Sequence, residues 1–147
     1  MEKILVFRTS TDATIKRLFC ELEGKNIDCL VQQSQFDRYR KEYPYIHFID
    51  ICQEGFYDLP VRVTDVIFRQ AYDQVYITFS DREGYGYGNV LKLIQQVNYR
   101  RAFFYNSNGD RTEIPGGNRI KDTLCRIYIE FTGFIYDIRE RMAGCAE

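Results

Sequence analysis

The chain has 147 residues, of which 45% are hydrophobic and 28% are charged, and this balance is typical of a globular protein large enough to bury one core. Its 20 basic and 21 acidic residues give a net charge of −1, so composition excludes a strongly basic nucleic-acid-binding protein. No run of the sequence approaches the roughly 20 apolar residues that span a bilayer, and without a signal peptide we expect a cytoplasmic protein.

The cysteines and the single histidine argue against a metal centre. The 5 cysteines are scattered with no CxxC pair, which predicts reduced thiols. The single histidine, His47, lies in the apolar run YIHFIDI, where a hydrogen-bonded strand histidine is favoured over a catalytic one. We therefore predict no metal ligands and no catalytic residues.

Short apolar runs alternate with segments of helical periodicity along the whole chain. The apolar runs predict strands at 3–10, 27–33, 45–51, 72–80 and 100–106. The periodic segments predict helices at 11–24, 34–44, 61–71, 89–97 and 118–142. Thr11 or Asp12 is expected to cap the first helix, and Ser34 the second. Turns are predicted at 107–110 and 114–117.

Five successive strand–helix units predict right-handed crossovers and a parallel sheet with helices on both faces. The expected fold is therefore a three-layer α/β domain, Rossmann-like or flavodoxin-like, with a five-stranded parallel sheet and a long C-terminal helix. We interpret residues 1–147 as a single domain, with a βα core over 1–110.

The predicted helix at 118–142 has an apolar stripe and a polar face of mixed charge. Three roles stay open for it: covering a face of the sheet, binding a protein partner or a second copy of the chain, or lying on a membrane surface. The mixed charge disfavours anionic lipid as the main attractor, and covering the sheet is the simplest of the three.

In open α/β sheets, ligands bind beyond the carboxyl ends of the strands, which here are followed by loops 8–14, 52–60 and 80–88. The first of these loops is rich in hydroxyl groups, and such groups hold an anion together with the unpaired N–H groups of a helix N-terminus. The candidate ligand-binding residues in it are Thr9, Ser10, Thr11, Asp12 and Thr14. A plain helix cap is the alternative interpretation, because the Asp12 carboxylate opposes a phosphate.

The segment SDREGYGYGN at 80–89 follows the fourth predicted strand. Ser80, Asp81, Tyr85 and Tyr87 are its candidate ligand contacts, since a tyrosine face stacks on a flat ring. GxGxG after the fourth strand is not the dinucleotide fingerprint, which follows the first strand. The alternative is a flexible loop whose glycines permit positive φ and whose tyrosines pack on the edge of the sheet.

Four stretches carry a resemblance to a known family: KILVFRTST, RYRKEYPYIHFIDI, VIFRQAYDQVYITFS and RRAFFYNSNGD. Over residues 3–110 the chain resembles the N-terminal half of GT-B glycosyltransferases of the lipopolysaccharide heptosyltransferase kind. The resemblance implies a site for a sugar or an acceptor. The first loop of that family ends in Gly-Asp, whose Asp is the expected general base, and Ala13 and Thr14 stand at the matching positions here.

In that family a second Rossmann-like domain binds the nucleotide-sugar donor, and 147 residues do not hold both domains. The resemblance therefore predicts a non-catalytic module that binds a sugar, a phosphosugar or a protein partner in cell-surface saccharide synthesis, without a cofactor. The alternative is a flavodoxin-like FMN-binding redox protein. For that reading, Thr9, Thr11 and Thr14 resemble the FMN phosphate loop, although flavodoxins have glycine at the position of Asp12.

Overall fold

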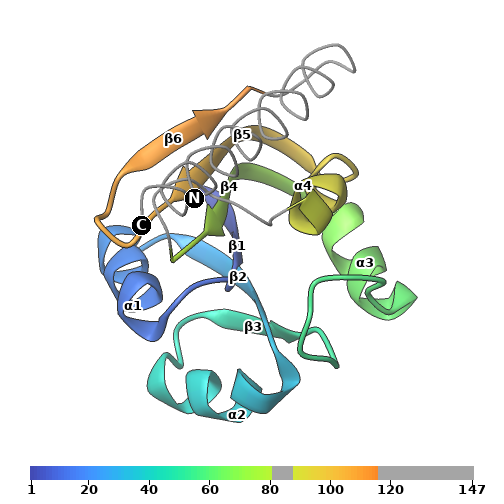
Figure 1. Cartoon of the computed structure of the whole chain (residues 1–147), viewed down its shortest axis with the longest axis horizontal. Coiled ribbons are helices and arrows are strands. Elements are labelled where there is room, and N and C mark those ends of the chain that lie inside the picture. Colours follow the sequence, from blue (N-terminus) through green and yellow to red (C-terminus); the bar gives the residue numbers. More distant parts are fainter. Residues whose placement is uncertain (81–87, 116–147) are drawn as a thin grey trace, which may run out of the picture. The chain divides into compact units, whose positions relative to one another are not determined.

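The computed structural model describes residues 1–80 and 88–115, which form a single sheet with four helices (Figure 1). The strands are β1 (Lys3–Phe7), β2 (Asn26–Val31), β3 (His47–Asp50), β4 (Ala71–Thr78), β5 (Asn98–Tyr105) and β6 (Arg111–Ile114). The helices are α1 (Asp12–Glu21), α2 (Gln33–Glu42), α3 (Val61–Phe68) and α4 (Gly88–Ile94). The predicted helix at 118–142 and the residues Asp81, Tyr85 and Tyr87 lie outside the described residues.

The strands follow the order β3-β2-β1-β4-β5-β6, and the first five are parallel. This is the Rossmann order, with β1 next to both β2 and β4. In the flavodoxin order, by contrast, the third strand is the neighbour of the first. Of the two related folds that the strand–helix alternation predicts, the strand order therefore matches the Rossmann-like one.

The prediction of exactly five strands is wrong, because β6 adds an antiparallel edge strand that pairs with β5. The sequence of β6, RTEI, has one apolar residue, Ile114, which is also its one buried residue. The strand therefore lacks the apolar pattern by which a strand is predicted. The turn before it depends on Gly109, which has a φ of +83°. The Asn106 side-chain oxygen accepts the N–H groups of Asn108 and Asp110, at 3.0 and 2.9 Å, and so closes the turn.

The core is centred on β1, where the run from Ile4 to Phe7 is completely buried. Such a continuous apolar run requires cover on both faces of the strand. Figure 1 shows α1 on one side of the central strands and α3 and α4 on the other. Ile15, Leu18 and Phe19 of α1 belong to one buried cluster with Ile4 and Val6 of β1. The predicted α/β class is confirmed, and the sheet is mostly parallel instead of wholly parallel.

The helix ends follow local backbone chemistry in part. Thr11 is the N-cap residue of α1, as predicted, and Gly24 takes a φ of +79° just beyond the end of this helix. The N-cap of α2, in contrast, is Gln32, so the prediction of Ser34 as its cap is wrong. Among the described residues, no helix is long and apolar enough to cross a membrane.

Candidate functional site

The strand order places the candidate site between the carboxyl ends of β1 and β4. The chain leaves β1 toward β2 through α1, and it leaves β4 toward β5 in the opposite direction across the sheet. This divergence is the topological switch point at which Rossmann-like domains bind ligands. The loop from residue 8 to residue 11 begins there, beside the end of β4 at Thr78.

Thr9 and Thr78 fasten the loop to the sheet. The Thr9 N–H donates to the Thr78 Oγ1 at 3.2 Å, and the Thr9 hydroxyl donates to the Thr78 carbonyl oxygen. The Thr78 hydroxyl in turn donates to the carbonyl oxygen of Phe7 at 2.9 Å. Thr9, a predicted ligand contact, thus holds β1 and β4 together, and this anchoring sets the direction in which the chain enters α1.

The start of α1 lacks the side-chain cap that the sequence predicts. The Thr11 side chain makes no capping hydrogen bond, and its Oγ1 lies 3.1 Å from the Oγ1 of the buried Thr14. The Asp12 carboxylate binds other side chains. Since the first N–H groups of a helix have no intrahelical acceptor, those of α1 keep donors and a favourable dipole for an anion.

Ser10 directly precedes the N-cap of α1 and is 8% exposed. Its hydroxyl oxygen is buried and has no hydrogen-bond partner within residues 1–80 and 88–115. A buried hydroxyl without a partner costs free energy, so such groups in native proteins call for a ligand, a water molecule or another explanation. Ser80, the candidate contact of the loop after β4 that the structure describes, is exposed two residues beyond the end of this strand.

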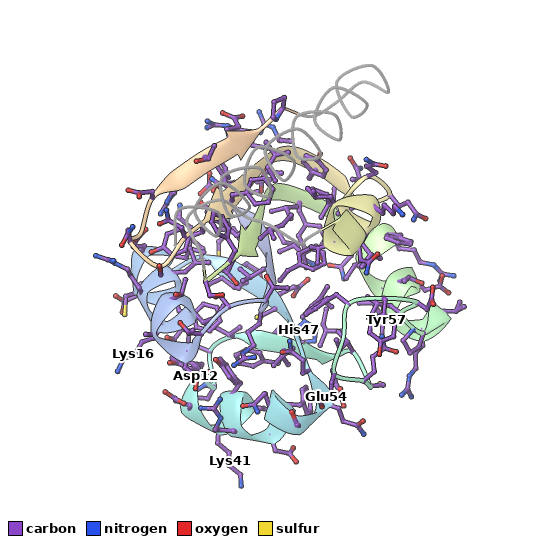
Figure 2. The ribbon with its side chains drawn as sticks, in the orientation of Figure 1. Asp12, Lys16, Lys41, His47, Glu54 and Tyr57 are labelled. Atoms are coloured by element: carbon purple, nitrogen blue, oxygen red, sulfur yellow. The ribbon has the colours of Figure 1, made fainter. Side chains whose placement is uncertain are left out.

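Asp12, the first residue of α1, is the centre of a charged cluster that reaches α2 (Figure 2). Both terminal nitrogens of Arg38 donate hydrogen bonds to the Asp12 carboxylate, at 2.8 and 3.0 Å, and Arg8 donates a third at 2.8 Å. The Tyr39 hydroxyl donates to the same carboxylate. These four residues are called the Asp12 cluster below. Its two arginines outnumber its one carboxylate, so the cluster carries an excess positive charge.

The electrostatics of the Asp12 cluster make Asp12 a poor general base. Its hydrogen bonds, that from Arg38 first, hold the pKa of the Asp12 carboxyl well below its ordinary value. Burial, followed by the hydrogen bond to Asp12, raises the pKa of Tyr39 to about 12. At neutral pH the carboxylate is therefore ionised and fully engaged by donors, while the phenol stays protonated.

The start of α2 is closed by a carboxylate from elsewhere in the chain. Glu54, in the loop after β3, accepts the Ser34 N–H at 2.9 Å and the Ser34 hydroxyl at 2.7 Å (Figure 2). A carboxylate at this position satisfies first-turn donors and favours the helix dipole. The N-termini of α1 and α2 thus differ, because the Asp12 carboxylate at the start of α1 is bound by arginine side chains instead of by the helix backbone.

A second polar cluster surrounds the buried Asp28 nearer the amino ends of the strands. Its carboxylate accepts the Tyr72 hydroxyl at 2.9 Å and lies 2.8 Å from the Nδ1 of His47 and 3.5 Å from the Nζ of Lys3. The prediction of a hydrogen-bonded strand histidine is confirmed. These four residues, called the Asp28 cluster below, come from four adjacent strands and hold them together.

Sequence reasoning located the loop at 8–14 but missed Arg8, Arg38 and Tyr39 as parts of the site. A signal for Arg8 exists, since it directly follows a buried strand and precedes Asp12 by four residues. Arg38 and Tyr39 carry no such signal, because they come from α2 and reach the site only through the fold. Among the described residues, no group of His, Cys, Asp or Glu side chains could hold a metal ion.

No family model and no curated protein matches the sequence. The resemblance to GT-B glycosyltransferases therefore stays a prediction.

Proposed function

We propose that this chain is a non-catalytic binding module for a sugar phosphate or a similar small anionic polyol, bound where β1 and β4 diverge. The observation that carries the proposal is the start of α1, which has no side-chain cap, beside a buried Ser10 hydroxyl that has no hydrogen-bond partner among the described residues. A phosphate group matches uncapped helix N–H groups, since both the hydrogen bonds and the dipole favour it.

The charge of the site supports an anion as the ligand. Asp12 by itself opposes a phosphate, but Arg8 and Arg38 both contact its carboxylate at 2.8 Å. The three side chains together therefore attract a negative group. Ser10 and Thr11 add hydroxyl groups, which suit a ligand whose other end is a polyol.

The proposal assigns no catalytic role to Asp12, because its carboxylate is ionised and engaged by donors and so accepts a proton poorly. The resemblance to the N-terminal half of glycosyltransferases supports a sugar-related ligand and a role in cell-surface saccharide synthesis. FMN is the competing ligand, and its phosphate has the same requirements. The Rossmann strand order does not favour FMN, so FMN is used as a comparison ligand.

Calorimetric titration with glucose 6-phosphate, glucose, inorganic phosphate and FMN tests the proposal. We expect glucose 6-phosphate to bind more tightly than glucose, because only the phosphate uses the start of α1. Ser10→Ala is expected to weaken this binding about tenfold, the effect of losing one hydrogen bond to a charged group. Ser107→Ala, in the exposed turn between β5 and β6, is the matched control and leaves the affinity unchanged.

Equal affinity for glucose and glucose 6-phosphate would contradict an anion site. An equal loss in Ser10→Ala and Ser107→Ala would also contradict it. A preference for FMN over glucose 6-phosphate by more than tenfold would instead favour the redox alternative. Purified protein that carries a bound yellow flavin would do the same.

A further inference from the structure

The Asp12 carboxylate occupies a receptor that is built for an anion. Four hydrogen bonds reach it from three side chains: two from Arg38, one from Arg8 and one from the Tyr39 hydroxyl. Guanidinium groups recognise both carboxylates and phosphates, because both present oxygens at a spacing that matches the N–H groups. The receptor is therefore not specific for the side chain that fills it.

The two guanidinium groups are held in place by contacts other than Asp12. The Tyr39 ring lies against both of them, with its centroid 5.2 Å from the Arg8 guanidinium carbon and 4.9 Å from that of Arg38. Arg8 also donates to the Gln32 side-chain oxygen at 3.2 Å, and Arg38 donates from its Nε to that of Gln35 at 3.0 Å. The cationic pair is thus expected to keep its position when the carboxylate leaves.

Asp12 is free enough to leave, since its side chain is 52% exposed. Exposed ion pairs contribute less to stability than buried ones, since water replaces the lost contacts, so opening those of Asp12 costs less than breaking a buried pair. A phosphate dianion brings twice the charge of a carboxylate and more acceptor oxygens to the same donors. A phosphate group is therefore able to compete with the Asp12 carboxylate for these donors.

From these contacts we infer that Asp12 is an internal competitor for the ligand, which a phosphate group displaces from Arg8 and Arg38 when it binds at the start of α1. The inference rests on the proposed anion site and adds that the arginines are ligand contacts. The buried hydroxyl of Ser10, two residues before Asp12, has no hydrogen-bond partner in the described part of the chain and is a separate sign of a missing ligand. The competitor lowers affinity for weak monoanions and so makes the site selective for phosphate.

Removing the competitor should strengthen binding, whereas removing an ordinary ligand contact weakens it. Asp12→Asn is therefore expected to bind inorganic phosphate and glucose 6-phosphate at least fivefold more tightly than the unmodified chain. Asp37→Asn, an exposed carboxylate on α2, changes the net charge equally and is the matched control. Its affinity should stay within twofold of the unmodified chain.

Arg38→Gln should weaken binding at least fivefold, while Arg40→Gln, the neighbouring arginine on α2, should change it less than twofold. All affinities are measured by calorimetry at constant ionic strength, because salt screens such contacts. A second readout uses the unmodified chain, in which NMR follows the Asp12 carboxyl carbon and the terminal Nη–H groups of Arg38, which donate to it. Saturating phosphate should shift both signals, since each loses the other as its partner.

The outcomes separate the two proposals. If the unmodified chain binds glucose 6-phosphate but Asp12→Asn binds no more tightly than Asp37→Asn, Asp12 is not a competitor for the ligand. The proposed ligand site stands in that case. Unshifted Asp12 and Arg38 signals at saturation overturn the competition by Asp12 as well. If neither the unmodified chain nor Asp12→Asn binds phosphate or glucose 6-phosphate, both proposals fail.

Discussion

The Asp12 and Asp28 clusters use the same chemical groups in opposite surroundings. Each centres on a carboxylate that accepts a tyrosine hydroxyl and meets basic side chains. The Asp28 side chain is 4% exposed and its partners stand on strands, whereas the Asp12 side chain is 52% exposed and two of its partners stand on α2. Burial is therefore the main physical difference between the two clusters.

This difference separates a structural role from a binding role. A buried carboxylate that loses its partners is left desolvated, so its contacts stay closed in the folded protein. A half-exposed carboxylate exchanges its partners for water or for a ligand at small cost. The Asp28 cluster is thus expected to control stability, and the Asp12 cluster to control binding.

The largest expected effect is that of Asp28→Ala. It leaves the buried Tyr72 hydroxyl and the Lys3 ammonium without their acceptor, and breaking a buried pair of this kind costs about 3 kcal/mol of unfolding free energy. Asp12→Ala should cost about 1 kcal/mol or less. Urea unfolding of both variants measures the contrast, and equal losses would erase the distinction between the clusters.

A gentler comparison removes one hydroxyl from each cluster. Tyr72→Phe deletes the donor to the buried Asp28 and is expected to cost about 1–2 kcal/mol. Tyr39→Phe deletes the donor to Asp12, whose arginines remain, and should cost about 0.5 kcal/mol. Both rings stay in place, so denaturant midpoints compare the hydroxyl groups alone. A larger loss for Tyr39→Phe would reverse the assignment of roles.

The smallest expected effect is a pH dependence carried by Asp12. Because the folded state lowers the pKa of this carboxyl below its unfolded value of about 3.9, its contribution to stability is complete above that pH. The contribution is lost as the pH falls further, through the lowered pKa. The stability gap between the unmodified chain and Asp12→Asn should therefore be constant from pH 7 to 5 and narrow below pH 4.

Urea midpoints of the two proteins at pH 7, 5, 4 and 3 measure this gap. The exposure of Asp12 keeps the stability gap small, so the informative result is that the gap narrows at low pH. A gap that stays the same at pH 3 would show that ionisation of Asp12 contributes nothing to folding.

The fold was predictable to the extent that local patterns carry it. The apolar run Ile4–Phe7 and the alternation of strands and helices predict the central strand and the α/β class, both of which are confirmed. β6 was missed because Ile114 alone of its residues is buried. Hydrophobic periodicity does not predict the order of the strands either, since this order depends on which strands pair across the sheet.

The candidate site shows the same limit. The loop at 8–14 follows from the rule that parallel strands present ligands at their carboxyl ends, but its partners on α2 do not. Ser34 looked like a helix cap because caps are usually local, and Glu54 reaches the start of α2 from 20 residues further along the chain. Contacts of this kind are set by tertiary structure and leave no mark on a local pattern.

The central claim is that a phosphate-bearing ligand binds at the open start of α1, and NMR of the backbone amides tests it most directly. Titration with glucose 6-phosphate should shift the N–H signals of residues 10–14 most strongly and leave those of Asp28, His47 and Tyr72 unchanged. Unchanged signals at residues 10–14, with the ligand in excess, would contradict the account.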